Sequence, residues 1–239
     1  MSTSPSRKQL NVTVVGAGIV GAAIAYSLSK RGAAVTVFDK GRPGGGATSH
    51  SFAWINATAK HPVSYHNFNR MSLGMWEPFA KDLDTDVGLR WGGQMEWAAT
   101  VEGAAELESR AAQLQAWGYP CQMLDAARMA QMEPGLTPGQ VKAAIYCELD
   151  GSAMIGEGSQ ESLARDDTQL HADELLARAA EYIPGLKGAS AIPVPVGYRP
   201  MPVDGFPVVG FSPKSPNVYM ALTHSGVTLA PLMAQLATM

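Results

Sequence analysis

Three glycines with the spacing Gly-x-Gly-x-x-Gly are the residues of this sequence whose pattern most directly implies chemistry. Gly16, Gly18 and Gly21 follow a β-branched run and open an alanine-rich stretch. In a dinucleotide-binding turn, the first glycine permits the tight turn, the second lets the backbone approach a pyrophosphate, and the third lets helix and strand pack closely. The helix that begins there offers the N–H groups of residues such as Ile19 and Val20, and the positive end of its dipole, to the phosphates.

An acidic residue completes this pattern. Asp39 lies eighteen residues after Gly21, at the end of the next β-branched run, and Lys40 beside it is included in the predicted site. A carboxylate at this place accepts hydrogen bonds from the adenosine ribose hydroxyls and disfavours a 2′-phosphate. The pattern predicts dinucleotide binding, against the alternative of a structural glycine turn in another α/β protein. By itself it does not distinguish FAD from NAD.

The elements that must position these residues form a βαβ unit. We expect a strand over residues 11–15, a helix over 19–31 that Gly32 ends, and a strand over 34–38. Residues 41–51 and the proline-rich stretch 192–207 are predicted to be irregular. Apolar spacing predicts further helices over 65–83, 101–117, 126–132, 170–183 and 227–237, and strands over 89–98, 122–124, 141–147, 153–155 and 217–222.

The composition excludes several classes of protein. With 46% hydrophobic and 16% charged residues, the 239-residue chain is expected to fold, and a net charge of −3 without a basic stripe argues against nucleic-acid binding. Its two cysteines, Cys121 and Cys147, are too few for a disulfide framework and are expected to be buried free thiols in a reducing compartment. No apolar run is long enough to span a bilayer, and no signal peptide is recognisable. We predict a cytoplasmic protein, with a peripheral membrane contact left open.

Two further stretches carry a resemblance to a known family. Residues 44–56 read GGGATSHSFAWIN, residues 196–210 read VGYRPMPVDGFPVVG, and residues 219–231 read YMALTHSGVTLAP. The first resembles the small-residue loop, and the other two resemble the closing pattern, of the FAD-dependent D-amino-acid oxidase, glycine oxidase and sarcosine oxidase superfamily. The resemblance implies an α/β fold with an FAD-binding Rossmann-like (GR2-type) domain and a reduced antiparallel sheet in the substrate domain. It assigns residues 1–60 and 190–239 to the first domain and residues 61–189 to the remnant of the second.

The resemblance also implies roles for individual residues around a substrate. Arg199 would hold the carboxylate of an amino acid with its planar guanidinium, and a structural salt bridge is its alternative role. Tyr198, which flanks it, would line the pocket or pack in the core. His224 is expected near the flavin ring, whereas His61, His66 and His171 are interpreted as surface or helix residues. We expect no metal ion.

The remaining predicted contacts are with FAD. In the small-residue loop, Ala47, Thr48 and Ser49 would lie at the pyrophosphate. His50 corresponds to a histidine that some relatives bond covalently to the flavin, and its alternative role is to line the pocket. At the last helix, the N–H groups of Gly226, Val227 and Thr228 would face the pyrimidine edge of the flavin. Three tryptophans, at positions 54, 91 and 97, are interpreted as pocket or core residues, with core packing favoured for at least two.

The family pattern is interrupted in the middle of the chain. Relatives carry, between the strand near Tyr146 and the strand near Met154, a further Rossmann strand and much of the substrate-binding sheet; here residues 146–151 run directly into residues 152–157. The resemblance further implies a last helix that continues beyond Met239. Loss of strands from a parallel sheet leaves edges and apolar faces uncovered. The sequence is compatible with a deletion variant, for which a homo-oligomer that covers these edges is an expected consequence, and equally with a fragment or with a sequence from which a segment has been dropped.

These observations predict an FAD-dependent oxidoreductase. By resemblance, it would oxidise the CH–NH group of a small amino acid, either a D-amino acid or an N-substituted glycine, by hydride transfer to flavin N5, with oxygen or a quinone as electron acceptor. The alternative is a catalytically impaired remnant that binds FAD or its ADP half. A third possibility, an NAD-dependent dehydrogenase, is disfavoured by the closing pattern from Arg199 to Thr228.

Overall fold

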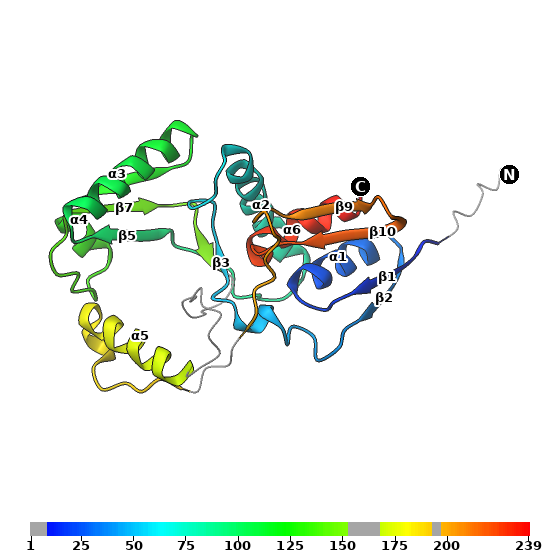
Figure 1. The fold of residues 1–239 in the computed structure, drawn as a ribbon, viewed down its shortest axis with the longest axis horizontal. Coiled ribbons are helices and arrows are strands. Elements are labelled where there is room, and N and C mark those ends of the chain that lie inside the picture. The colour runs from blue at the N-terminus through cyan, green and yellow to red at the C-terminus, as the bar shows by residue number, and fades with distance from the viewer. Residues whose placement is uncertain (1–8, 153–167, 193–196) are drawn as a thin grey trace. The chain divides into compact units, whose positions relative to one another are not determined.

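The computed structural model describes residues 9–152, 168–192 and 197–239, and the chain divides into two compact units (Figure 1). Within the described residues, unit 1 comprises residues 9–89, Ser152 and residues 197–239, and unit 2 comprises residues 90–151 and 168–192. The strand predicted over residues 153–155 lies outside the described residues. The assignment of cofactor binding and substrate binding to separate domains stays a prediction.

Unit 1 begins with the predicted βαβ unit. Strand β1 (Asn11–Val15) pairs in parallel with β2 (Ala34–Phe38), and α1 (Ile19–Lys30) connects them. The helix ends one residue earlier than predicted, and Gly32 follows it with a φ of +88°, a conformation that favours glycine. The local pattern therefore fixed both the order and the direction of these elements.

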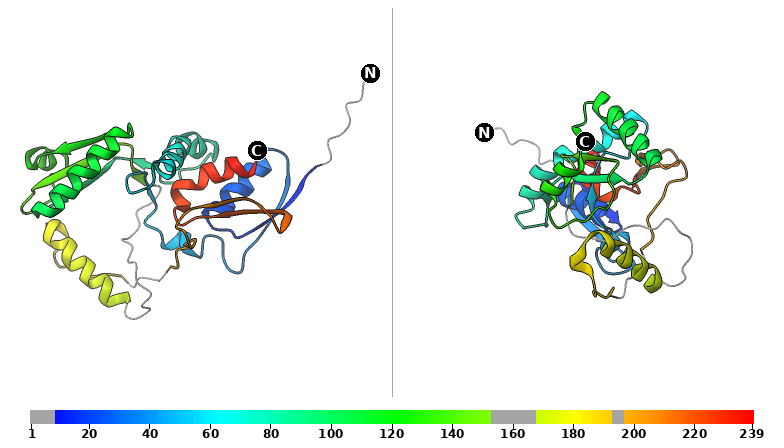
Figure 2. Two further views of the ribbon diagram at one scale, coloured as in Figure 1. Left: turned by 45° about the horizontal axis from the view of Figure 1, so that its top comes forward. Right: turned by 90° about the vertical axis from the view of Figure 1, so that its left-hand side faces the viewer.

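The core of unit 1 is built around its last helix. Helix α6 (Gly226–Ala237) runs beside α1 and also packs against α2 (Val63–Asp82) (Figures 1 and 2). Because α6 is apolar on nearly every face, it is buried along most of its length. A cluster of Tyr65, Leu229, Leu232 and Met233 forms the centre of this packing.

An antiparallel hairpin and two short elements complete unit 1. Strand β9 (Val208–Ser212) pairs with β10 (Ser215–Leu222). Only the second of these strands was predicted, because the sequence around β9 resembles a turn. The loop after β2 contains a 3₁₀ turn, η1 (Ala47–His50), and the short strand β3 (Trp54–Ile55), neither of which the sequence predicted.

Unit 2 is a three-stranded antiparallel sheet in the order β5-β7-β6, with α3 (Val101–Ala116) packed on it (Figure 1). The strands are β5 (Gln94–Ala98), β6 (Cys121–Leu124) and β7 (Ala143–Cys147). This sheet confirms the expected reduced antiparallel sheet. The other elements of this part of the chain are β4 (Arg90–Trp91), α4 (Ala126–Met132), β8 (Gly151–Ser152), α5 (Thr168–Tyr182) and η2 (Pro184–Leu186).

One predicted strand is wrong in detail. Residues 89–98 do not form a continuous strand, because Gly93 has a φ of +73° and breaks it into β4 and β5. A Cβ atom on Gly93 would lie 2.4 Å from the ring of Tyr146. The break therefore lets the backbone pass close under an aromatic side chain, which a residue-type pattern does not reveal.

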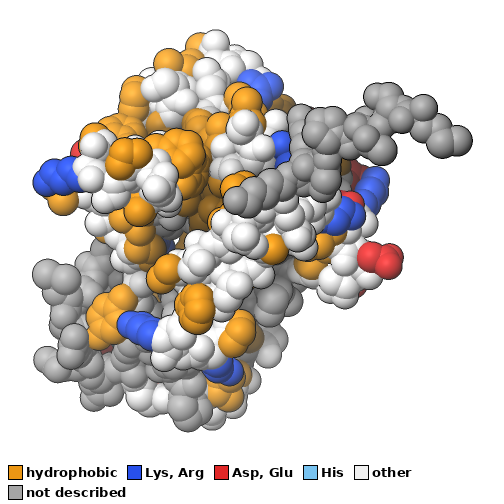
Figure 3. Space-filling view, turned by 90° about the vertical axis from the view of Figure 1, so that its right-hand side faces the viewer, with side chains coloured by type: hydrophobic (Ala, Val, Ile, Leu, Met, Phe, Trp, Pro, Cys, Tyr) orange, Lys and Arg blue, Asp and Glu red, His pale blue; other side chains and the backbone are white. Residues whose placement is uncertain are grey.

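Apolar side chains reach the surface of unit 1. Val15 is 85% exposed and Phe38 is 59% exposed, although parallel strands are normally covered on both faces. Hydrophobic side chains form several patches in the space-filling view of Figure 3. None of the helices in the described stretches is long and apolar enough to cross a bilayer.

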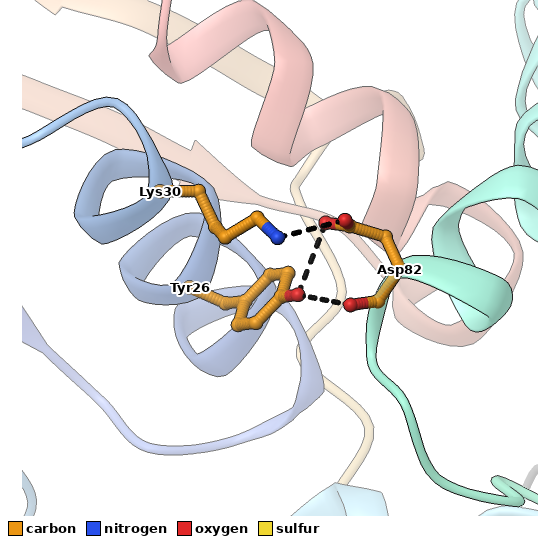
Figure 4. A network of polar contacts seen from close by, with 3 residues as sticks. All are labelled: Tyr26, Lys30 and Asp82. Atoms are coloured by element: carbon orange, nitrogen blue, oxygen red, sulfur yellow. Dashed lines mark hydrogen bonds and ion pairs between the residues drawn. The ribbon is translucent and has the colours of Figure 1, made fainter.

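A polar cluster joins α1 to the end of α2 (Figure 4). Asp82 accepts hydrogen bonds from Lys30 Nζ at 2.8 Å and from Tyr26 OH at 3.0 Å through its carboxylate. The hydrogen bond from Lys30 lowers the pKa of Asp82, and the same bond raises the pKa of Lys30. These ionised forms stabilise the contact between the two helices.

The Asp82 contact predicts a pH dependence of stability. The folded pKa of Asp82 lies below its ordinary value of 3.8, so its contribution is present above that value and is lost as the pH falls through the folded pKa. We expect Asp82→Asn to make the melting temperature fall less steeply with acidification below about pH 5. Thermal melts from pH 7 to the acid limit measure this, with Glu181→Gln as an exposed control. Equal slopes in wild type and Asp82→Asn would contradict the assignment.

Candidate functional site

The glycine turn of unit 1 has the close packing that a dinucleotide-binding turn requires. Gly16 has a φ of +108°, and its N–H donates to Phe38 O at 2.7 Å. A Cβ atom on Gly21 would lie only 1.9 Å from Gly16 O, so α1 can approach the turn only with glycine at position 21. The first and third glycines therefore play the structural roles that the sequence predicted.

Asp39 is fixed at the end of β2 by two backbone donors. Ala17 N donates to Asp39 Oδ2 at 2.7 Å, and Gly41 N donates to Oδ1 at 2.8 Å. The N–H of Ala17 is the main cause of the lowered pKa of this carboxyl group. The residue is exposed, as is Lys40, so its carboxylate oxygens have further acceptor capacity beside the glycine turn.

The small-residue loop folds back onto the same turn. Gly44 N donates to Ala17 O at 2.9 Å, and Ile19 N donates to Thr48 Oγ1 at 3.0 Å. Gly18, at the N-cap of α1, has no side chain to cap the helix, and a Cβ atom there would lie 3.2 Å from Thr48 Oγ1. Thr48 therefore sits at the helix N-terminus, where its predicted contact with a phosphate would be made.

His50 connects this loop to the segment that carries Arg199. His50 Nδ1 lies 2.7 Å from Gly46 O and 3.2 Å from Ser49 Oγ. Because a carbonyl oxygen only accepts, Nδ1 carries the proton in this contact. A Cβ atom on Gly197 would lie 2.2 Å from His50 Cβ, so the backbone of the closing segment passes directly over His50.

The two residues after Gly197 lie at the surface of unit 1. Tyr198 is 63% exposed and Arg199 is also exposed. Across the described stretches, the guanidinium of Arg199 takes part in no hydrogen bond or ion pair. Sequence reasoning grouped these two residues with His224, and no contact among the described residues joins His224 to Arg199.

The N-termini of α1 and α6 lie side by side. A Cβ atom on Gly226 would lie 3.4 Å from Val20 Cγ2 and 3.7 Å from Ile19 Cγ2. Ser225, the N-cap of α6, makes no side-chain capping bond. Unit 1 therefore presents two neighbouring helix N-termini, each with the positive end of its dipole, to one region.

Thr228 has a structural role in addition to its predicted one. Its hydroxyl accepts from Asn56 N at 3.3 Å and donates to Trp54 O at 3.1 Å, and the side chain is buried. Its hydroxyl thus holds the segment around β3 against α6. Any cofactor contact at Val227 and Thr228, which are both buried, would use the backbone.

Sequence reasoning missed a polar cluster at the start of α6, here called the α6 cluster, formed by Lys60, Tyr65, His224 and Ser225. Ser225 Oγ lies 3.1 Å from Lys60 Nζ, 3.2 Å from Tyr65 OH and 3.3 Å from His224 Nδ1. Tyr65 OH also lies 3.2 Å from His224 Nε2. Ser225 precedes a helix start and was detectable as an N-cap, whereas Lys60 and Tyr65 meet it only through the tertiary fold.

The interior beneath these helix ends holds a tryptophan and a histidine. Trp76 Nε1 donates to Val227 O at 3.1 Å and to Thr228 O at 3.2 Å. His66 lies in α2, but it is fully buried and not at the surface, and its Nδ1 lies 2.8 Å from Ala57 O. Burial lowers the pKa of His66, so it is neutral at physiological pH.

The tryptophans proposed as pocket or core residues differ in their surroundings. Trp54 and Trp97 are partly buried, and Trp97 makes an edge-to-face contact with Tyr182. Trp91 is 41% exposed. Among the described residues no group of histidine, cysteine, aspartate and glutamate side chains has the arrangement of a metal site.

The residues of unit 1 fit a dinucleotide cofactor. The Gly16–Gly21 turn admits no Cβ atom at position 21, and the two helix N-termini supply N–H donors for an anionic group. Asp39 lies at the end of β2, where a dinucleotide-binding fold has the acceptor for the ribose hydroxyls.

The family profile described as "FAD dependent oxidoreductase" (DAO) matches residues 11–154 and 148–239 of this chain. Glycine oxidase of Geobacillus kaustophilus is 31% identical over 59% of this chain and 39% of its own length. Monomeric sarcosine oxidase of Streptomyces avermitilis is 25% identical over 74% of this chain and 47% of its own length. The crystal structure of the Geobacillus kaustophilus glycine oxidase superposes with a TM-score of 0.78 at 21% identity, over 94% of this chain and 92% of that chain.

The match to the family falls into two pieces that meet at residues 148–154. This is the place at which the sequence predicted an interruption of the family pattern. The matched sequence spans less than half the length of these curated relatives. The structural similarity, at 21% identity, concerns the fold.

Proposed function

Because the chain belongs to the family of FAD-dependent oxidoreductases, we propose that it binds FAD and oxidises the CH–NH group of a small amino acid, either a D-amino acid or an N-substituted glycine. The observation that carries this proposal is the juxtaposition in unit 1 of the close-packed Gly16–Gly21 turn, Asp39 and the neighbouring N-termini of α1 and α6. Membership of this family argues against the NAD-dependent alternative.

In this proposal the FAD is held by residues of unit 1. The N–H groups at the start of α1 and the loop of Ala47, Thr48 and Ser49 bind the pyrophosphate, and Asp39 accepts from the ribose hydroxyls. The backbone of Gly226, Val227 and Thr228 faces the flavin end. When bound, FAD supplies the capacity to accept a hydride from the substrate carbon.

The protein itself positions the substrate. Arg199 offers five donors in a planar fork to the carboxylate, and its exposed guanidinium has no protein partner among the described residues that would compete. The α6 cluster places the hydroxyl of Tyr65 and the ring of His224 beside a helix N-terminus, which favours negative charge. Orientation of the substrate by these groups is the main contribution of the polypeptide to the rate. The electron acceptor in this proposal is oxygen or a quinone.

A second candidate function is an FAD-binding or ADP-binding remnant without turnover. The supporting observation is the exposure of Val15 and Phe38 on strands that would be covered in a larger parallel sheet. In this candidate the cofactor site persists and substrate binding is lost. A homo-oligomer that covers these strands would be compatible with either candidate function.

The visible spectrum of the purified chain distinguishes the two candidates. We expect flavin absorption bands that bleach on anaerobic addition of a member of a panel of D-amino acids and N-methylated glycines. Bands that never bleach would favour the remnant. A colourless protein that takes up no added FAD would refute both, and yellow colour retained in an acid precipitate would assign a covalent flavin, with His50 as the first residue to replace.

Replacement of Arg199 tests the substrate site. We expect Arg199→Met to raise KM by about 30-fold, because a charged hydrogen bond is worth about 1.5–3 kcal/mol, with the flavin spectrum and FAD affinity unchanged. The matched control is Arg178→Met, which removes an exposed arginine from α5 in the other unit. An unchanged KM for Arg199→Met in an active enzyme would remove Arg199 from the site.

A further inference from the structure

Unit 2 contains a pair of thiols placed directly opposite each other in its sheet. Cys121 is the first residue of β6, and its partner in the antiparallel register is Cys147 of β7. Their sulfur atoms lie 3.3 Å apart, and both residues are free cysteines. Both are buried, with 4% and 1% exposure. This is the distance of a thiol–thiol hydrogen bond, and the sulfur atoms would have to approach to about 2.05 Å to form a disulfide bond.

The surroundings make the two sulfurs unequal. Cys147 donates its S–H to the sulfur of Cys121, and this bond lowers the pKa of Cys121 and raises the pKa of Cys147. Burial raises the pKa of Cys121, as do Asp150 and Glu96, whereas the Arg110 guanidinium, paired with Glu96 at 2.5 Å, lowers it. Cys121 is also the thiol on the edge strand β6, which makes it the nucleophile of the pair.

We propose that Cys121 and Cys147 form a redox-active dithiol that reacts with hydroperoxides and closes to an intrachain disulfide. The Cys121 thiolate attacks the terminal oxygen of the hydroperoxide, the O–O bond breaks, and the products are a sulfenic acid at Cys121 and an alcohol or water. The thiol of Cys147 then attacks the Cys121 sulfur, the S–O bond breaks, and water leaves with the proton of the thiol. Two thiols are oxidised and one peroxide is reduced.

The sheet allows this chemistry. Strand β6 lies at an edge of the order β5-β7-β6, so it can move toward β7 without breaking a second ladder. Opening of the same edge gives a small peroxide access to the buried sulfurs. The new bond would fasten the edge strand to the central strand, and it would close the loop between residues 121 and 147. The dithiol lies wholly in unit 2, so the inference does not depend on flavin binding.

Oxidation of the reduced chain with hydrogen peroxide tests the proposal. We expect loss of both thiols at one equivalent of peroxide, a mass lower by about 2 Da, and a peptide map that joins residues 121 and 147. The disulfide is expected to raise the melting temperature of unit 2 by roughly 5–15 °C. A monomer that keeps both thiols, or oxidation only to sulfinic and sulfonic acids, would overturn the proposal.

Single-cysteine variants assign the order of events. In Cys147→Ser, which keeps a hydroxyl donor at this position, we expect a sulfenic acid at Cys121 that a dimedone probe traps. In Cys121→Ser, the remaining thiol should react at least about tenfold more slowly, because Cys147 lies on the central strand β7 and is the more deeply buried of the two cysteines. Equal labelling of both variants would refute the nucleophilic role of Cys121. The mass and peptide map of the wild-type chain decide the disulfide itself if either variant fails to fold.

Discussion

Replacing Gly21 with alanine is expected to lower the affinity for FAD by at least about 100-fold, or about 2.7 kcal/mol. The added Cβ atom would lie 1.9 Å from Gly16 O and 3.5 Å from Val14 Cγ1, so α1 must move away from β1 and the turn. The N–H groups at the start of the helix move with it, and they are the donors proposed for the pyrophosphate. The same displacement should reduce the free energy of unfolding by about 1–3 kcal/mol.

Two measurements separate the binding defect from the loss of stability. Titration of the apoprotein with FAD gives the affinity, and urea unfolding of the same sample gives the stability. The matched control is Gly74→Ala: Gly74 lies inside α2 with no atom within 4 Å of an added Cβ, and alanine there is expected to stabilise the helix by about 0.5–1 kcal/mol. A Gly21→Ala variant that binds FAD normally would remove the glycine turn from the cofactor site.

Trp76→Ala is expected to lower the free energy of unfolding by about 3–5 kcal/mol. Trp76 is 3% exposed and makes an edge-to-face contact with Phe79. Its indole N–H is also the donor to Val227 O and Thr228 O in the first turn of α6. Truncation therefore leaves a cavity, removes two hydrogen bonds and loosens the helix end that is proposed to face the flavin.

A conservative variant divides this effect into packing and hydrogen bonding. Trp76→Phe keeps an aromatic ring but has no donor, and it should cost about 1–3 kcal/mol through the unsatisfied carbonyl groups. Met71→Ala, on the exposed side of the same helix, should stay within about 0.5 kcal/mol of wild type. Chemical denaturation with and without FAD measures all three. A Trp76→Ala variant as stable as Met71→Ala would show that the contacts of Trp76 in α2 do not stabilise α6.

The parts of the fold that local pattern dictates were predictable. The βαβ unit follows from a β-branched strand, a glycine turn and an alanine-rich helix, and its strands have the predicted bounds. Helix α4 also has the predicted bounds, and Asp125 at its N-cap accepts from Arg128 N at 2.7 Å. Residue types with one dominant conformational use were therefore sufficient to predict the bounds of these elements.

Elements whose conformation depends on distant contacts were not predictable. Residues 89–98 contain a glycine pair, Gly92 and Gly93, that marks a break in the strand, but nothing local shows that Gly93 passes beneath Tyr146, some fifty residues away in sequence. His66 has no neighbour in sequence that signals burial, because the partner of its Nδ1 is a carbonyl oxygen in the loop before α2. The pattern of a single segment contains no information about such partners.

The candidate site shows the same division. Gly16, Gly21 and Asp39 could be located from spacing alone, because a dinucleotide-binding βαβ unit has the glycines in the turn after its first strand and the acidic residue at the end of its second. Lys60 and Tyr65 could not, since they meet Ser225 only after α2 and α6 have packed together. The roles of Arg199, Tyr198 and His224 toward a substrate stay predictions, and the Arg199→Met kinetics test the first of them.

The pairing of α1 with α6 at the centre of unit 1 has a consequence for synthesis of the chain. The two helices are separated by about two hundred residues, and all of unit 2 is encoded between them. At a ribosomal rate of about 5–20 residues per second, roughly 10–40 s pass between the synthesis of α1 and that of α6. The local antiparallel sheet of unit 2 has time to form in this interval. During that interval the apolar face of α1 and the strands beside it are exposed to chaperones, so the nascent chain should be a chaperone client until α6 has emerged.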